Sequence, residues 1–99
     1  MVKISWTQLA VQDLEDIREF IAQDSEKYAV ITINKIFLSA DNLQEYPELG
    51  RMVPEIGVPK IRELIIGNYR LIYNLKSKEE LDILRIYSSL RHLSKKKLK

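Results

Sequence analysis

The sequence predicts one α+β domain, in which a helical hairpin packs on one face of an antiparallel sheet and a short basic tail follows. The first half of the chain repeats apolar residues at helical spacing, which is typical of amphipathic helices. The second half contains three runs of β-branched and aromatic residues, which indicate strands. Because 99 residues suffice for one hydrophobic core, residues 1–99 are predicted to form a single domain of order β-α-α-β-β-β.

The predicted hairpin follows a short strand at residues 2–6, where apolar and polar side chains alternate. Thr7 is a suitable N-cap for a helix that runs to about residue 23, and Ser25 can cap a second helix. The two apolar stripes contain Leu9, Ala10, Leu14, Ile17 and Ile21 in the first helix, and Ala29, Ile33, Ile36, Phe37, Ala40 and Leu43 in the second. The residues expected in the core are Leu14, Ile17, Ile33, Phe37 and Leu71.

The segment from residue 46 to residue 60 contains all three prolines and two of the three glycines. It is therefore predicted to be a structured loop without regular secondary structure. The strands predicted after it lie at residues 61–66, 69–75 and 81–88. Gly67 and Asn68 form a suitable turn between the first two strands, because both tolerate a positive φ.

The middle predicted strand carries a charged residue that should point away from the helices. Strand alternation places Leu71 and Tyr73 on one face and Arg70 on the other. If the helices cover the first face, Arg70 projects from the uncovered face, where a ligand could reach it.

Composition excludes several classes of protein and site. No apolar run approaches the roughly 18 residues of a membrane span, and the first residues do not resemble a signal peptide, so a cytoplasmic protein is expected. The absence of cysteine excludes disulfides and thiolate chemistry. With His92 as the single histidine and three isolated glycines, no metal and no cofactor are predicted. Asp13 and Asp16 are interpreted as part of a solvated helix face.

Charge is distributed unevenly along the chain. Residues 1–50 contain four Lys/Arg and nine Asp/Glu, whereas residues 51–99 contain twelve and five. This asymmetry suggests that a polyanion or an acidic partner binds the second half of the chain. The alternative is a solvated basic tail, since Lys95, Lys96, Lys97 and Lys99 supply four of these charges.

Arginines and tyrosines are interleaved along the predicted strands. Arginine stays charged and clamps phosphate with two hydrogen bonds, and aromatic rings can stack on bases. The alternative is that the arginines face water while the tyrosine rings pack in the core. The residues predicted to contact a nucleic acid or a protein target are Arg51, Arg62, Arg70, Tyr73, Arg85, Tyr87, Arg91 and Lys95.

Short motifs are spread over almost the whole chain, from Ile4 to about Leu93. They include Trp6-Thr7, Asp13-Leu14, Tyr46-Pro47-Glu48-Leu49-Gly50-Arg51, Ile61-Arg62-Glu63-Leu64, Asn68-Tyr69-Arg70-Leu71-Ile72-Tyr73 and Ile83-Leu84-Arg85-Ile86-Tyr87. At these spacings the chain resembles the RelE/ParE superfamily of toxins from type II toxin–antitoxin systems. The resemblance implies a toxin that shares the predicted fold and forms a hetero-oligomer with an antitoxin encoded by an adjacent gene. An acidic antitoxin segment is expected over the basic sheet surface and the helical hairpin.

The superfamily that the chain resembles has two functional branches. RelE-like members cut messenger RNA in the ribosomal A site, whereas ParE-like members inhibit DNA gyrase. Arg70 and Arg91 match the arginines of the nuclease branch. His92 could act there as a general acid or base, and the alternative is that a lone histidine in the tail has no such role.

The sequence departs from the nuclease pattern at other positions. Where RelE carries lysines ahead of the Tyr-Arg pair, this chain has Ile61 and Glu63, and where RelE carries a C-terminal catalytic tyrosine, the tail offers Lys97. The turn at Gly50 and the Ile-Arg-Glu-Leu segment resemble the ParE branch. The resemblance therefore favours inhibition of gyrase by binding. The alternative is a metal-independent, ribosome-dependent mRNA endoribonuclease with the catalytic residues Arg70, Arg91 and His92.

Overall fold

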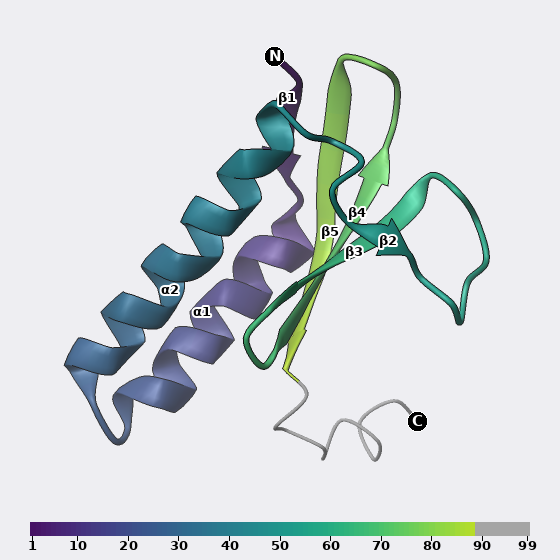
Figure 1. The fold of residues 1–99 in the computed structure, drawn as a ribbon. Coiled ribbons are helices and arrows are strands. Elements are labelled where there is room, and N and C mark those ends of the chain that lie inside the picture. The colour runs from purple at the N-terminus through teal and green to yellow at the C-terminus, as the bar shows by residue number, and fades with distance from the viewer. Residues whose placement is uncertain (89–99) are drawn as a thin grey trace.

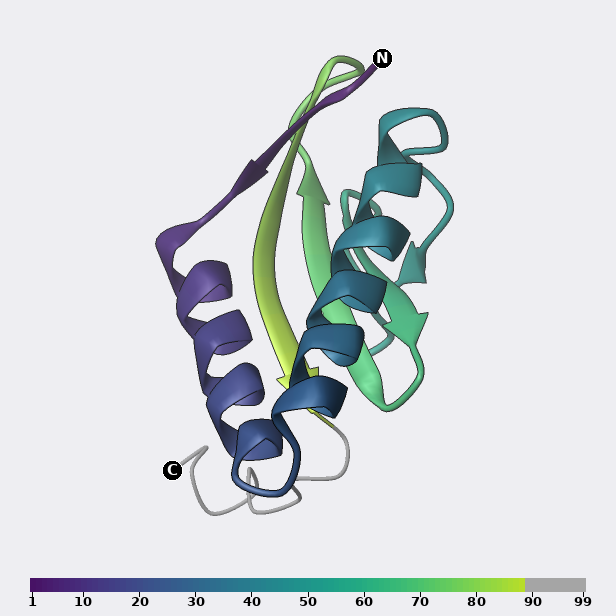
Figure 2. The same ribbon diagram turned by 90° about the vertical axis from the view of Figure 1, so that its left-hand side faces the viewer.

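Two helices lie side by side across one face of a five-stranded sheet in the computed structural model, which describes residues 1–88 (Figure 1). The view turned by 90° shows both helices in front of the sheet (Figure 2). This two-layer α+β arrangement confirms the predicted fold class. The predicted basic tail, with Arg91, His92 and Lys95, lies outside the described residues.

The helices begin where the sequence predicts. They are α1 at Gln8–Ala22, α2 at Glu26–Asp41 and the short 3-10 helix η1 at Asn42–Gln44. Thr7 Oγ1 accepts a hydrogen bond from the backbone N–H of Ala10, and Ser25 Oγ accepts one from that of Tyr28. Each hydroxyl thereby satisfies an N–H group that the first turn of a helix leaves unpaired. Within residues 1–88, no helix is long and apolar enough to cross a membrane.

The strands form a sheet of order β1-β5-β4-β3-β2. They are β1 at Lys3–Trp6, β2 at Arg51–Met52, β3 at Ile61–Ile66, β4 at Tyr69–Leu75 and β5 at Glu80–Ser88. The pairs among β2, β3, β4 and β5 are antiparallel as predicted, whereas β1 pairs in parallel with β5, which the predicted antiparallel sheet did not include. Gly67 opens the turn between β3 and β4 with a φ of +60°, which confirms the positive φ expected there.

Strand β2 corrects the prediction that residues 46–60 contain no regular secondary structure. Its two residues pair with β3, with Arg51 opposite Glu63 and Met52 opposite Arg62. Gly50 makes this pairing possible, because a Cβ on it would lie 2.5 Å from the backbone oxygen of Glu63 and 2.8 Å from the Tyr73 hydroxyl. Composition predicted a loop because it does not report how closely a glycine lets one strand approach another.

The core lies between the helices and the sheet. Leu14, Ile17 and Leu71 are buried there as predicted, and Ile33 is partly buried against them. A register shift between β4 and β5 places Tyr73 opposite Ile83 and Ile72 opposite Arg85. The extra residue of this bulge, Leu84, allows Ile83 and Ile86 to face the core although they are three positions apart.

The predicted core position of Phe37 is wrong. Its side chain is 41% exposed, whereas the neighbouring Ile36 is fully buried. Phe37 lies at the margin of the apolar stripe, where its ring packs against Trp6 with 5.1 Å between the ring centroids. The helical spacing identified the right stripe but did not distinguish its centre from its edge.

Candidate target-binding face

The face of the sheet opposite the helices is called the open face here, and it carries most of the predicted site residues. Because Leu71 and Tyr73 point into the core, strand alternation places Arg70 on the open face, as predicted. The pairing register places further residues there as cross-strand neighbours. The open face comprises Arg51, Glu63, Ile65, Arg70, Ile72, Arg85 and Tyr87.

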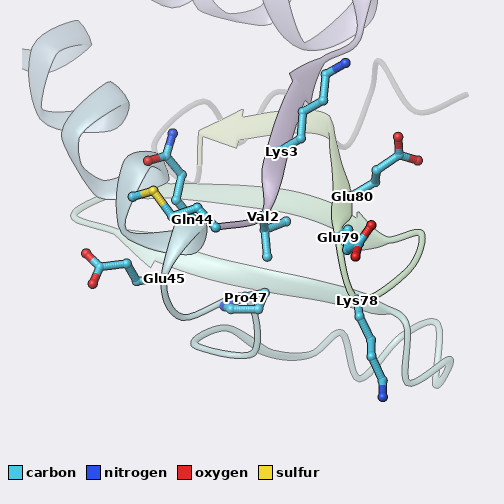
Figure 3. Close-up of a pocket in the computed structure, with 9 residues that line it drawn as sticks. Val2, Lys3, Gln44, Glu45, Pro47, Lys78, Glu79 and Glu80 are labelled. Carbon is cyan, nitrogen blue, oxygen red and sulfur yellow. The ribbon is translucent and has the colours of Figure 1, made fainter.

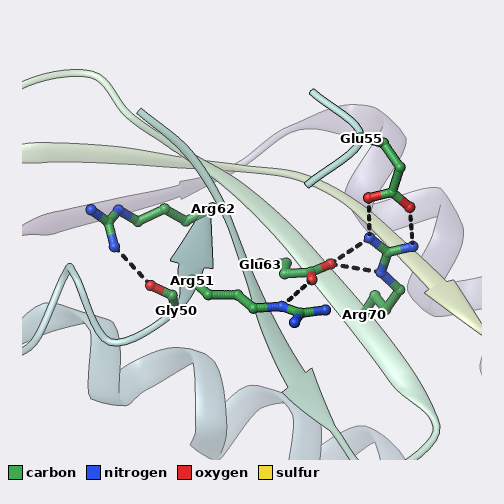
Figure 4. Close-up of polar contacts among 6 residues, drawn as sticks. All are labelled: Gly50, Arg51, Glu55, Arg62, Glu63 and Arg70. Carbon is green, nitrogen blue, oxygen red and sulfur yellow. Dashed lines mark hydrogen bonds and ion pairs between the residues drawn. The ribbon is translucent and has the colours of Figure 1, made fainter. Parts of the chain in front are cut away.

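Glu63 is the central charged residue of the open face, and its side chain is 0% exposed. Arg51 of β2 donates from Nε to one carboxylate oxygen at 2.6 Å, and Arg70 of β4 donates from Nε to the other at 2.6 Å (Figure 4). The two arginines come from the strands on either side of β3. Two positively charged arginines therefore hold the buried carboxylate. A buried ion requires such partners of opposite charge.

The outer edge of the Arg70 guanidinium binds a second carboxylate. Its two Nη atoms donate to the two carboxylate oxygens of Glu55 at 3.2 Å each (Figure 4). The hydrogen bonds that Arg70 donates to Glu55 and then to Glu63 raise the pKa of Arg70, and the hydrogen bond that Glu55 accepts from Arg70 lowers the pKa of Glu55. All three guanidinium nitrogens of Arg70 are thus engaged by the chain's own carboxylates.

Arg62 and Tyr73 hold the loop before β2. Arg62 donates from Nη1 to the Gly50 backbone oxygen at 2.8 Å, while its buried Nε has no hydrogen-bond partner among the described residues. The Tyr73 hydroxyl donates to the Pro47 oxygen at 2.7 Å and accepts from the Gly50 N–H at 2.9 Å. Burial raises the pKa of Tyr73. Neither residue lies on the open face, because both side chains turn toward the loop.

Arg85 joins the sheet to α1. It donates from Nε and Nη2 to the two oxygens of Asp13 at 2.9 and 3.2 Å, and the Asp13 carboxylate also accepts the Ile86 N–H at 2.9 Å. The hydrogen bond that Arg85 donates to Asp13 raises the pKa of Arg85. The guanidinium lies 5.2 Å from the centre of the Tyr87 ring, within cation–π range. The interpretation of Asp13 as part of a solvated face is wrong, because its side chain is only 13% exposed.

The structure therefore brings Arg51, Arg70, Arg85 and Tyr87 together on one face and places Arg62 and Tyr73 elsewhere. Arg91, His92 and Lys95 lie outside the described residues. Sequence reasoning missed Glu63 as a site residue. A signal was present, since a charged residue in a run such as Ile-Arg-Glu-Leu-Ile-Ile requires a partner if the strand is central.

A hollow of about 740 Å³ lies at the start of β1, beside η1 and the turn between β4 and β5. Val2 and Pro47 line its middle, whereas Lys3, Lys78 and Glu45 point away from one another at its rim (Figure 3). The charged groups do not converge on one point. Among residues 1–88, no group of three or more His, Asp or Glu side chains could hold a metal ion.

Comparison with known proteins finds relatives of this chain in sequence and in fold. Residues 4–93 match the model of a family described as ParE toxin of type II toxin–antitoxin system, parDE. Toxin RelE2 of Caulobacter vibrioides is 36% identical over 66 residues, which cover 67% of this chain and 70% of that protein. A structure of the chromosomal ParDE TA system from P. aeruginosa superposes with a TM-score of 0.74 at 25% identity, covering 89% of this chain and 96% of that one.

Proposed function

This chain belongs to the ParE toxin family of type II toxin–antitoxin systems, and we propose that it inhibits DNA gyrase by binding, without catalysing a reaction. The family membership makes it a toxin with a cognate antitoxin. Gyrase as the target is the proposal. It is supported by the resemblance of the Gly50 turn and of residues 61–64 to the ParE branch, and by the state of Arg70.

The engagement of Arg70 is the observation that carries this proposal. An RNA-cutting relative would need this arginine to stabilise the charge on the reacting phosphate. Here the guanidinium donates to Glu63 and to both oxygens of Glu55. A phosphate that approached Arg70 would have to displace one carboxylate and remain close to another. Binding to a protein target does not require Arg70 to release either carboxylate.

The same pairing bears on where the antitoxin binds. Because the arginines of the open face are neutralised by internal carboxylates, its attraction for an acidic partner is reduced. The helical hairpin offers a different surface, where Ile31 and Leu38 of α2 are 49% and 68% exposed and line a shallow hollow with Lys35. We therefore expect the antitoxin to cover α2 with an apolar segment that also carries acidic residues.

The experiment compares two activities of the purified toxin. We expect inhibition of supercoiling by gyrase, relief of that inhibition by the protein encoded beside the toxin gene, and intact mRNA on programmed ribosomes. His92→Gln is the matched variant, because His92 is the chain's single histidine, the side-chain type whose ordinary pKa lies near neutral pH. Gyrase inhibition should survive His92→Gln. Cutting of ribosome-bound mRNA that disappears in His92→Gln would assign the protein to the nuclease alternative instead.

A further inference from the structure

Arg51, Glu63 and Arg70 have the geometry of an anion-binding site whose occupant belongs to the chain itself. We propose that Glu63 is a specificity residue, which fills with its own carboxylate a site that Arg51 and Arg70 would otherwise offer to a nucleic-acid phosphate. The open face then rejects RNA and DNA. This inference deepens the proposed function, because a toxin directed at a protein must avoid capture by the cell's nucleic acids.

The convergence of two arginines on one group indicates an anion site. Arg51 and Arg70 approach from the strands on either side of β3, and each contacts a different oxygen of Glu63 (Figure 4). Two oxygens of a phosphate are spaced much like those of a carboxylate, and guanidinium groups bind both kinds of anion through paired N–H groups. Without the negative charge of Glu63, the same two side chains could clamp one phosphate.

Glu63 has advantages over any phosphate from solution. Its backbone pairs with Arg51 of β2 on one side and with Ile72 of β4 on the other, so the carboxylate is held in place with no loss of translational freedom. Its side chain is fully buried, whereas Arg51 and Arg70 remain 66% and 32% exposed. If Glu63 no longer bound them, Arg51 could be reached from solvent directly, and a phosphate would reach Arg70 by displacing the exposed carboxylate of Glu55.

The charges of this group decide how it acts on a polyanion. Arg51 and Arg70 are balanced by Glu63 and Glu55, so the four side chains together are neutral. Replacing Glu63 by glutamine leaves one uncompensated positive charge at the point where both arginines meet. Each additional phosphate contact strengthens binding to a single strand and makes the affinity more sensitive to salt.

The test measures the affinity of each variant for a short, fluorescently labelled single-stranded RNA by anisotropy. We expect Glu63→Gln to bind the RNA roughly three- to tenfold more tightly than wild type at low salt. The slope of log K against log salt should steepen by about 0.7. Adding Arg70→Gln to Glu63→Gln should reverse the gain. Every variant carries the same lysines after residue 94, so differences between variants report the open face.

Glu55→Gln is the matched control, because it removes an equal charge from the same arginine but leaves Glu63 between the two guanidinium groups. Its gain in RNA affinity should be smaller than that of Glu63→Gln. Thermal unfolding and circular dichroism establish that each variant is folded. A folded Glu63→Gln protein that binds RNA no better than wild type, or no better than Glu55→Gln, overturns the proposal.

A second variant keeps the proposal testable if Glu63→Gln does not fold. Glu63→Asp retains the charge, but its carboxylate is one methylene shorter and should reach only one of the two arginines. A smaller gain in RNA affinity is expected, and no gain counts against the proposal in the same way. Gyrase is absent from these measurements. Failure of this inference is therefore distinguishable from failure of the proposed function, which the wild-type supercoiling assay decides.

Discussion

The face of the sheet beneath the helices is built from aliphatic side chains, whereas the open face is organised around one buried carboxylate between two arginines. Leu71 and Ile83 represent the first face, and both are fully buried. Arg51, Glu63 and Arg70 represent the second. Apolar burial needs only a neighbour of suitable shape, but an ion pair needs one particular partner at one distance. The face beneath the helices can therefore form from many combinations of aliphatic residues, whereas the open face requires particular charged residues at particular positions.

The two faces also differ in what they contribute to stability. Burying one large aliphatic side chain stabilises a fold by about 1.5–3 kcal/mol. An exposed ion pair contributes about 0–1 kcal/mol, and a buried pair roughly offsets the cost of removing its charges from water. The face beneath the helices, called the covered face below, should thus determine whether the chain folds. The open face should determine whether the folded chain binds nucleic acid.

The largest effect expected from this comparison is at Leu71. Leu71→Ala should lower the free energy of unfolding by about 2–5 kcal/mol, because the side chain is fully buried and its removal leaves a cavity. Phe37→Ala is the matched control, since it deletes a larger side chain that is 41% exposed, and it should cost only about 1–2 kcal/mol. Urea unfolding measures both values. A loss at Phe37 as large as that at Leu71 would contradict the assignment of the covered face.

The next effect concerns Tyr73, which connects the core to the loop before β2. Tyr73→Phe keeps the buried ring but leaves the Pro47 carbonyl and the Gly50 N–H without their hydroxyl partner. The free energy of unfolding should fall by about 1–3 kcal/mol. Urea unfolding at neutral pH is the measurement, and an unchanged midpoint would show that water replaces the hydroxyl without loss.

Tyr73 also predicts a loss of stability at alkaline pH. Burial raises the pKa of Tyr73 above its ordinary value of 10.0, so the unfolded chain releases this proton at a lower pH than the folded one. Its contribution is complete below pH 10.0 and is lost as the pH rises through the folded pKa. The slope is at most about 1.4 kcal/mol per pH unit. Urea unfolding above pH 10.0 should show that stability falls less steeply with pH in Tyr73→Phe than in wild type. An equally steep fall in the variant would exclude Tyr73 as its cause.

Most of the fold could be predicted from the sequence, because local signals agreed with one another. The hydroxyls of Thr7 and Ser25 begin the helices where predicted, and Gly67 supplies the positive φ of the turn between β3 and β4. Strand β2 was missed because it depends on a contact made far away in the sequence. Only the approach of Gly50 to the backbone of Glu63 allows those two residues to pair with β3.

The candidate site was harder to predict than the fold. Alternation placed Arg70 on the correct face, but it could not show that Glu55 and Glu63 already bind the guanidinium. Asp13 was missed for the same reason, because its partner Arg85 lies 72 positions further along the chain. A sequence reveals which side chains can form ion pairs, whereas the tertiary fold decides which of them do.

The smallest effect is expected at Glu55, on the exposed rim of the open face. Hydrogen bonds from Arg70 lower the pKa of Glu55 from its ordinary value of 4.5. A carboxyl group whose folded pKa is lowered stabilises the protein above pH 4.5, and that contribution is lost as the pH falls through the folded pKa. Because both partners are accessible to solvent, water and salt screen the pair.

Glu55→Gln should therefore shift the urea midpoint only slightly at neutral pH, less than Tyr73→Phe does. The difference from wild type should shrink as the pH falls below 4.5, where the wild-type carboxyl becomes protonated, and it should also shrink in high salt. A loss that is independent of pH and salt would mean that the Glu55 side chain stabilises the loop by packing. A loss as large as that of Tyr73→Phe would contradict the division between the two faces, because an exposed ion pair would then stabilise the fold as much as the buried hydroxyl of Tyr73.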